Sequence, residues 1–201
     1  MTTPTVKNFT LVQGDTFDKD VHWEVEPVVF KAITGITQAA PVVLTVPTHG
    51  LVSGWRTAVV SVKTMIELNA LKDPPKDPSD YHQMKVNDPS TIELVGVDSS
   101  LYTAYGAGGG YLRYNTPKDL AGYTARMSIK DKVGGTEILR LTDVNGGIVI
   151  DNVAKTIKIL MTATQTAAIT KACVYDLEMV NGTVVTKIVR GKLSLMPEVT
   201  L

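Results

Sequence analysis

Apolar and polar residues alternate with a period of two along most of the chain, which predicts β-strands rather than helices. The clearest case is Val174–Val180, which is followed by Asn181-Gly182 and by a second β-rich run, Thr183–Arg190. Asn-Gly between two such runs predicts a hairpin, because a type I′ turn needs positive φ at both central residues. Gly191 interrupts the second run and predicts a bulge or bend before Lys192–Met196 resumes the alternation.

Similar runs predict several more strands upstream. Phe9–Val12 and Phe17–Trp23 flank Gly14-Asp15, and we expect them to form a hairpin or paired strands. The one segment that favours a helix is 162–171, where Thr162 or Thr164 can act as the N-cap. The remaining predicted strands are Tyr123–Ile129, Glu137–Thr142, Gly147–Ile150 and Lys155–Met161.

The middle of the chain, from Ile33 to about Tyr114, has a different texture. Its apolar runs are short, and they are separated by the proline-rich stretch Asp73–Asp80 and by a glycine hinge at 106–110. Short strands bounded by Gly and Pro are typical of a small β-barrel or sandwich. We therefore expect an all-β fold, a β-sandwich with one short helix formed by residues 1–32 and 115–201, interrupted by a small β-barrel-like module at 33–114.

Composition narrows the class of protein. The 201 residues carry 20 Lys and Arg against 20 Asp and Glu, so the net charge is zero. This balance argues against a nucleic-acid binder that works through a basic surface, and it offers no polybasic membrane patch. A near-neutral chain favours association. There is no apolar run of about 18 residues and no signal-peptide layout, so we expect no membrane contact and no export by a leader.

No catalytic or metal-binding constellation emerges from the sequence. His22, His49 and His82 do not have metal-ligand spacing, and His49 is expected to hydrogen-bond backbone in a turn. The single cysteine, Cys173, cannot form an intramolecular disulfide and is interpreted as a buried small apolar residue at a strand start. The glycines at 106–110 precede a strand, not the Gly-Lys-Ser/Thr that opens a phosphate-binding helix. We therefore predict no catalytic residue, no metal and no cofactor.

An ordered set of motifs resembles a known family. The motifs are Gln13-Gly-Asp-Thr-Phe17, Asp119-Leu-Ala-Gly-Tyr-Thr-Ala-Arg-Met127, Tyr175-Asp-Leu-Glu178, Asn181-Gly182, Gly191-Lys-Leu-Ser-Leu195 and Pro197-Glu-Val-Thr200. Their order and approximate spacing resemble tailed-phage virion proteins related to the N-terminal domain of the baseplate upper protein, except that about 90 residues separate the first motif from the second. The resemblance implies a β-sandwich.

The intervening segment carries a second resemblance. Ile33–Val43, Thr48–Leu51, Met65–Asn69 and Leu94–Tyr105 are similar to a small β-module of phage tail proteins, related to the first catalytic cysteine half-domain of ubiquitin-activating enzymes. Cys173 lies outside this module, so no ubiquitin chemistry is implied. The proline-rich stretch between Ala70 and Met84 departs from the usual module.

Together the resemblances imply a non-enzymatic virion structural protein, made in the host cytoplasm. It would be an adaptor in the tail, baseplate or head–tail neck. The implied partners are copies of itself and other phage tail, neck or fibre proteins, with no nucleic acid, no membrane and no small-molecule substrate. The candidate protein–protein interface comprises Tyr102, Tyr105, Tyr111, Tyr114, Pro74, Pro75 and Pro78, together with the two termini.

Other interpretations stay open at this stage. The tyrosines can equally be explained by ordinary packing within the inserted module. A carbohydrate-binding module for host recognition is the alternative function, with Trp55, Tyr102, Tyr105 and Tyr111 as its aromatic platform. A tail-attached enzyme would need a carboxylate pair or a metal cluster that the sequence does not display.

Overall fold

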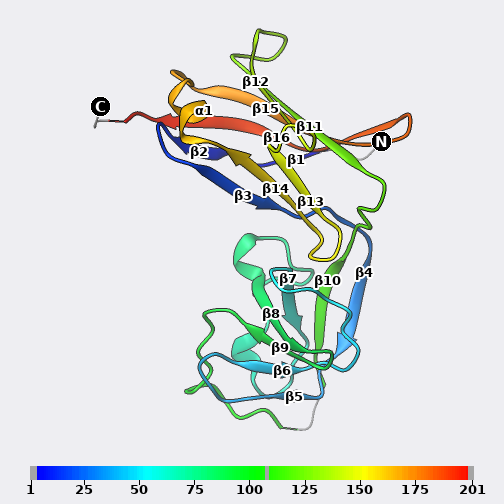
Figure 1. Ribbon diagram of the computed structural model, residues 1–201. Helices are drawn as coiled ribbons and strands as arrows, with labels where there is room; N and C mark the ends of the chain where they lie inside the picture. The colour runs from blue at the N-terminus through cyan, green and yellow to red at the C-terminus, as the bar shows by residue number, and fades with distance from the viewer. Residues whose placement is uncertain (1–3, 107–108, 199–201) are drawn as a thin grey trace. The chain divides into compact units, whose positions relative to one another are not determined.

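The structure is a computed structural model that describes residues 4–106 and 109–198 (Figure 1). Strands account for 48% of the chain and helix for 6%, which confirms the all-β sandwich fold expected from the alternating pattern. The chain forms two compact units. The first, here called the sandwich unit, comprises Met1–Trp23 and Asp119–Leu201, and the second unit comprises Glu24–Lys118.

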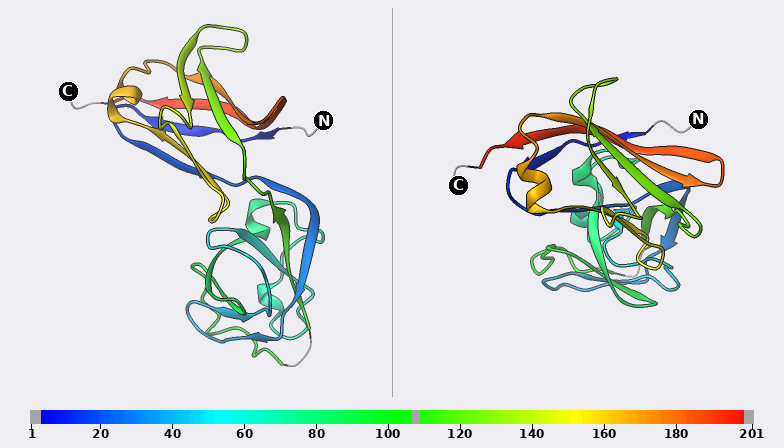
Figure 2. Two further views of the ribbon diagram at one scale, coloured as in Figure 1. Left: turned by 45° about the vertical axis from the view of Figure 1, so that its right-hand side comes forward. Right: turned by 45° about the horizontal axis from the view of Figure 1, so that its top comes forward.

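A six-stranded sheet forms one layer of the sandwich unit (Figure 1). Its strands run in the order β1-β16-β15-β11-β12. β2 also pairs with β16, at residues closer to the C-terminal end of β16 than those that pair with β1. Both N-terminal strands are parallel to β16, so the beginning and end of the chain lie side by side in this sheet (Figure 2). The six strands are β1 (Thr5–Val6), β2 (Phe9–Val12), β11 (Thr124–Lys130), β12 (Glu137–Thr142), β15 (Cys173–Asn181) and β16 (Val184–Met196).

The predicted Asn-Gly hairpin joins β15 to β16. Asn181 pairs with Val184, and Gly182 has a φ of 57°, as the tight turn requires. The bulge or bend expected at Gly191 does not form there, because Gly191 pairs with Tyr175 in regular register and the register shift lies opposite Leu177 and Glu178. An added Cβ at Gly191 would overlap the carbonyl oxygen of Lys7, so the glycine admits a close backbone neighbour.

A three-stranded sheet forms the other layer, with β14 (Thr156–Met161) between β13 (Ile148–Asp151) and β3 (Phe17–Val21). The expected pairing of Phe9–Val12 with Phe17–Trp23 is therefore wrong, since β2 and β3 belong to different sheets. The reason is that both strands turn an aromatic side chain into the core. The rings of Phe9 and Phe17 meet edge to face, with centroids 5.6 Å apart, so the Gly14-Asp15 turn connects the two layers.

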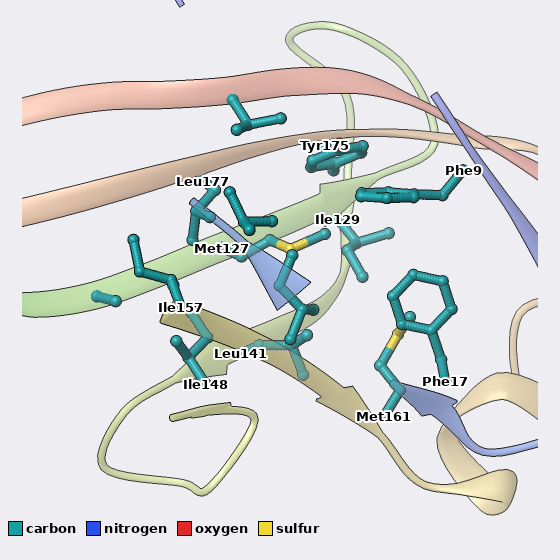
Figure 3. Close-up of a cluster of buried hydrophobic side chains, with 14 of the residues drawn as sticks. Phe9, Phe17, Met127, Ile129, Leu141, Ile148, Ile157, Met161, Tyr175 and Leu177 are labelled. Carbon is teal, nitrogen blue, oxygen red and sulfur yellow. The ribbon is translucent and has the colours of Figure 1, made fainter. Parts of the chain in front are cut away.

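The core of the sandwich unit lies between these sheets (Figure 3). Alternate residues of each strand point inward, as the period of two requires. Met127, Ile129 and Leu177 from the larger sheet have no exposed surface, and Ile157 from the smaller sheet is buried equally. Cys173, the first residue of β15, is 3% exposed, which confirms its interpretation as a buried apolar residue. Burial raises the pKa of its thiol.

The helix α1 (Ala163–Ala167) ends earlier than the predicted segment 162–171. Thr162 is its N-cap, and Gln165 bonds back to Thr162, which completes a capping box. The hydroxyl of buried Thr166 donates to the carbonyl of Asp15 at 2.7 Å. This bond anchors the helix to the connection between β2 and β3, and such packing explains why so short a helix forms.

The second unit contains a seven-stranded sheet in the order β4-β10-β7-β8-β9-β6-β5. Glu24 pairs with Pro117, so the residues through which the chain enters and leaves this unit are neighbours. Sequence analysis had assigned 24–32 and 115–118 to the sandwich, whereas β4 and β10 pair with each other here. The strands are β4 (Glu24–Ala32), β5 (Gly35–Ile36), β6 (Val43–Thr45), β7 (Arg56–Val60), β8 (His82–Asp88), β9 (Thr91–Leu94) and β10 (Tyr111–Pro117).

Two short 3-10 helices, Ile66–Leu68 and Pro78–Asp80, interrupt the connection from β7 to β8. The core of this unit surrounds Trp55, which has no exposed surface and whose Nε1 donates to the carbonyl of Asn115 at 3.0 Å. Of the expected hinge at 106–110, residues 107 and 108 lie outside the described part of the chain, as do the terminal residues 1–3 and 199–201. Within the described residues, no helix is long and apolar enough to span a membrane.

Candidate functional site

Three of the four candidate interface tyrosines take part in packing within the second unit. Tyr114 is 4% exposed, and its hydroxyl donates to the carbonyl of His49 at 2.6 Å. The hydroxyl of Tyr105 donates to the carbonyls of Ile33 and Gly109. Tyr102 packs, partly buried, against the same core. These contacts fit the packing explanation that sequence analysis held open.

Tyr111 differs from the other three, because its side chain is 46% exposed. Its ring meets that of Phe30, which is 55% exposed, edge to face at a centroid distance of 6.4 Å. Phe30 comes from β4, the edge strand of the seven-stranded sheet. Phe30 and Tyr111 therefore form an exposed aromatic pair, of which only Tyr111 was predicted from the sequence.

The proline-rich stretch is an ordered loop in which Pro74 and Pro78 are exposed and Pro75 is buried. Its organising residue is Asp80, which is 1% exposed. The Asp80 carboxylate accepts hydrogen bonds from four backbone N–H groups, those of Leu71, Lys72, Lys76 and Asp77. The N–H groups of Lys76 and Asp77 contribute most to lowering the pKa of this carboxyl, because they stabilise its charged form.

Two of the three histidines contact backbone atoms within their own unit. Nδ1 of His49 accepts from the N–H of Leu51 at 3.1 Å, which leaves Nε2 to donate to the carbonyl of Asp88 at 2.9 Å. This confirms the expected backbone bonding of His49. His22 contacts the carbonyl of Lys155 through Nδ1. Among the described residues, no group of three or more His, Cys, Asp or Glu side chains is arranged to hold a metal ion.

The aromatic platform proposed for the carbohydrate-binding alternative does not form as expected. Trp55 is fully buried and its indole N–H is bonded to backbone, so its ring presents no face to a sugar. The hydroxyl of Tyr105 is likewise bonded within the unit. Of the four platform residues, only Tyr111 is substantially exposed.

A large hollow lies on the outer face of the six-stranded sheet, the face turned away from the sandwich core. It has a volume of about 900 Å³ and is bounded by β1, β11, β12, β15, β16 and the loop between β11 and β12. That loop extends away from the sheet in Figures 1 and 2. We call this feature the basic hollow, because seven cationic side chains and two carboxylates line it: Arg126, Lys130, Lys132, Arg140, Lys187, Arg190 and Lys192, with Asp176 and Glu178.

The two carboxylates on the floor are already paired. The Glu178 carboxylate lies 2.7 Å from Nε of Arg126, and the Asp176 carboxylate lies 2.6 Å from Nζ of Lys187. The hydrogen bond from Lys187 to Asp176 is the main reason that the pKa of this lysine is raised. Arg140 is paired with Glu137 beside the hollow at 3.0 Å. One part of the hollow is thus close to electrical balance.

The other part of the hollow carries cations that have no close ion-pair partner, and of these Lys130 lies opposite Glu137 in the ladder and interacts with it electrostatically. Lys130, Lys132, Arg190 and Lys192 form no ion pair within 4 Å with any residue that the structure describes. Arg190 lies opposite Asp176 in the ladder, but the carboxylate of Asp176 is bound by Lys187. Lys130 and Lys192 flank Val174 from either side. These four cations give this part of the hollow a net positive charge.

A β-bulge brings Lys187, Arg190 and Lys192 to the same face. The register shifts opposite Leu177 and Glu178, and Ile188 and Val189 are both buried. Two consecutive inward residues reset the alternation, so 190 and 192 share the outward direction of 187. The hollow was not predicted from the sequence, because net charge averages over the chain. The available signal was the apolar doublet between Lys187 and Arg190, which breaks a strict period of two.

Comparisons with known proteins add little to this picture. No family model and no curated protein matches the chain. Among solved structures it is similar to a tri-modular endo-β-1,4-glucanase from Bacillus licheniformis, at 9% identity and a TM-score of 0.25. A structure of the same enzyme complexed with cellotetraose is similar at 9% identity and a TM-score of 0.26. Each match covers 94% of this chain and 37% of the enzyme. TM-scores this low carry no argument about fold or function.

Proposed function

We propose that the chain is a non-enzymatic structural subunit of a tailed-phage particle, an adaptor that assembles in several copies and holds neighbouring tail, neck or fibre proteins. The support comes from the way distant motif residues meet. Gln13 of the first motif donates its N–H to the carbonyl of Met196 at 2.9 Å, next to the last motif. A Cβ added to Gly14 would overlap the carboxylate of Glu198 in that last motif.

The middle motifs meet in the same way. Met127 of the second motif lies opposite Leu177 of the third, and Arg126 is paired with Glu178. Four segments that are distant in sequence therefore form two mutually contacting pairs within one sandwich. This pairwise contact is the observation that supports the proposal, because the motifs of the resemblance come together within one sandwich.

The arrangement also suits an adaptor. The sandwich unit offers the basic hollow, and the second unit offers the exposed pair of Phe30 and Tyr111. A chain with two separate exposed surfaces can contact two neighbours at once. Aromatic residues and arginine are enriched at the centres of protein–protein interfaces.

The test is the composition of purified particles. Phage lysate is banded on a density gradient, and peptides of this chain are quantified by mass spectrometry against those of the major capsid protein. The proposal expects a fixed ratio across the particle band, while an abundant host cytoplasmic protein falls away from it. Recovery of the chain only from the soluble fraction would overturn the proposal.

A further inference from the structure

We infer that the basic hollow binds an extended acidic peptide segment of a neighbouring protein, with the cations Lys130, Lys132, Arg190 and Lys192 as its recognition groups. The inference deepens the proposed function and rests on it for the identity of the neighbour as a particle protein. Its own basis is the charge and shape of the outer sheet face.

The spread of the unpaired cations indicates an extended ligand. Arg190 and Lys192 are separated by one residue on β16, so their Cα atoms lie about 6.7 Å apart. Lys130 and Lys192 are two strands apart in the ladder, a distance of about 9.6 Å between backbones. Lys132 is carried by the loop between β11 and β12. A single small anion cannot engage all of these positions.

An extended peptide matches this spacing. Its side chains alternate, so every second residue faces the same way at a repeat of about 6.7 Å. Alternate Asp or Glu residues would therefore meet Arg190 and Lys192 in succession. Carboxylates bound there would form ion pairs with the cations, and arginine binds a carboxylate through two parallel hydrogen bonds.

One feature favours a peptide over a nucleic acid. Apolar side chains are interspersed with the cations: Val6 is 64% exposed and Val133 is 89% exposed on the rim, with Val174 on the floor. They offer contacts to the aliphatic parts of a peptide that a phosphate backbone does not use.

The volume is also appropriate. About 900 Å³ lies within the size range of ligand sites, roughly 300–1,000 Å³. A short peptide segment fills such a space, whereas a nucleic-acid duplex would have to rest across its rim. The shallow, charged floor predicts binding that depends strongly on ionic strength.

The test uses the full purified chain and a fluorescent peptide of alternating Glu and Val residues, followed by fluorescence anisotropy. Binding should weaken as salt is added, and a matched peptide with Gln in place of Glu should not bind. The double variant Arg190→Glu/Lys192→Glu should weaken binding by about tenfold or more. Unchanged affinity in this variant would overturn the inference.

A control variant separates local recognition from net charge. Lys19→Glu/Lys63→Glu makes the same change in net charge at two exposed lysines outside the hollow, and it should bind as the parent does. Circular dichroism and thermal midpoints check folding. If charge reversal prevents folding, Arg190→Gln/Lys192→Gln removes the charges without introducing new ones and should still lose most of the binding.

A further binding experiment tests a nucleic acid as the alternative ligand of the basic hollow. Labelled single-stranded oligodeoxythymidine should bind more weakly than the acidic peptide, and tighter binding of the oligonucleotide through the same residues would overturn the inference. The binding assay needs only purified chain, while the proposed function is tested on particles. A chain that bands with particles and ignores the peptide refutes the inference alone. Peptide binding by a chain absent from particles refutes the proposed function alone.

Discussion

The hydroxyl of Tyr175 donates a hydrogen bond to the backbone carbonyl of Lys7, with an oxygen–oxygen distance of 2.7 Å. The two residues are 168 positions apart, and the bond fixes the N-terminal strands beside β16 at the point where β1 ends and before β2 begins. The Tyr175 ring also stacks on Phe9 at a centroid distance of 5.6 Å. Burial raises the pKa of this hydroxyl, so it remains a donor across the physiological range.

Removal of this hydroxyl should destabilise the sandwich unit. Tyr175→Phe keeps the stacked ring and leaves the Lys7 carbonyl without its side-chain donor, which should cost about 1–2 kcal/mol in the free energy of unfolding. Urea unfolding followed by circular dichroism measures the change. Tyr111→Phe is the matched control, because the hydroxyl of Tyr111 forms no hydrogen bond with any described residue. An equal loss in both variants would contradict the role of the bond.

The same region predicts a strict requirement for glycine at 191. Gly191→Ala would place a Cβ against the Lys7 carbonyl, which is backbone and cannot rotate away. We expect a loss of about 3 kcal/mol or more, at the upper end for overpacked positions. Gly106→Ala is the comparison, since the nearest atom to its Cβ is 3.4 Å away, an ordinary contact. A thermal midpoint for Gly191→Ala that equals the parent value would refute the close approach.

In the second unit, Asp80 should be essential to the proline-rich loop. Asp80→Asn replaces one acceptor oxygen by an NH2 group that faces backbone N–H donors, so two of the four bonds are lost and the donors repel. The thermal midpoint should fall, read from the fluorescence of buried Trp55 in a Trp23→Phe background. Asp73→Asn removes the same charge from an exposed site in the loop and should leave the midpoint unchanged.

The stability of the second unit should depend on pH through His82. Burial lowers the pKa of His82 in the folded chain, so the unfolded chain binds the proton more readily. Stability is therefore constant above the unfolded pKa of about 6.5 and falls as the pH drops below it, by at most about 1.4 kcal/mol per pH unit. Urea titrations of parent and His82→Gln between neutral and mildly acidic pH should show the slope in the parent only.

The carboxylates of Asp88 and Asp98 affect stability in a separate, more acidic pH range. Hydrogen bonds from Thr91 and from Ser100 lower the pKa values of Asp88 and Asp98. Their stabilisation is present above the unfolded pKa of about 3.9 and is lost as the pH falls through the lower folded values. A slope near neutral pH therefore reports the histidine rather than these side chains.

Local features of the fold were predictable from the sequence, because local physics determines them. Asn181-Gly182 sets its own backbone angles, and the alternation of Val174–Val180 fixes which residues face the core. The parallel pairing of β1 and β2 with β16 was not predictable, because it joins the two ends of the chain and depends on packing across the whole sandwich. The separation of β2 from β3 was missed for the same reason.

The candidate site was hidden from composition for a different reason. A net charge of zero describes the whole chain, whereas the basic hollow collects cations from β11, β12, β16 and one loop. Asp176 and Glu178 are neighbours of these cations, yet they neutralise only Lys187 and Arg126. Which charges remain unpaired is decided by the register and by the bulge at Ile188; the apolar doublet hints at the bulge, but the register requires the strand pairing.

The start of α1 offers a last discriminating experiment, because two threonines were equally plausible caps in the sequence. The side-chain oxygen of an Asn, Asp, Ser or Thr cap accepts a backbone N–H near the third helical residue, and Oγ1 of Thr162 accepts from the N–H of Gln165 at 3.2 Å. Thr162→Ala should therefore lower the free energy of unfolding by about 1 kcal/mol. Thr164 is exposed within the first turn, so Thr164→Ala should be neutral or slightly stabilising, as helix propensity favours alanine. Chemical denaturation of the two variants side by side distinguishes the caps. A larger loss of unfolding free energy in Thr164→Ala than in Thr162→Ala would contradict the role of Thr162 as the N-cap.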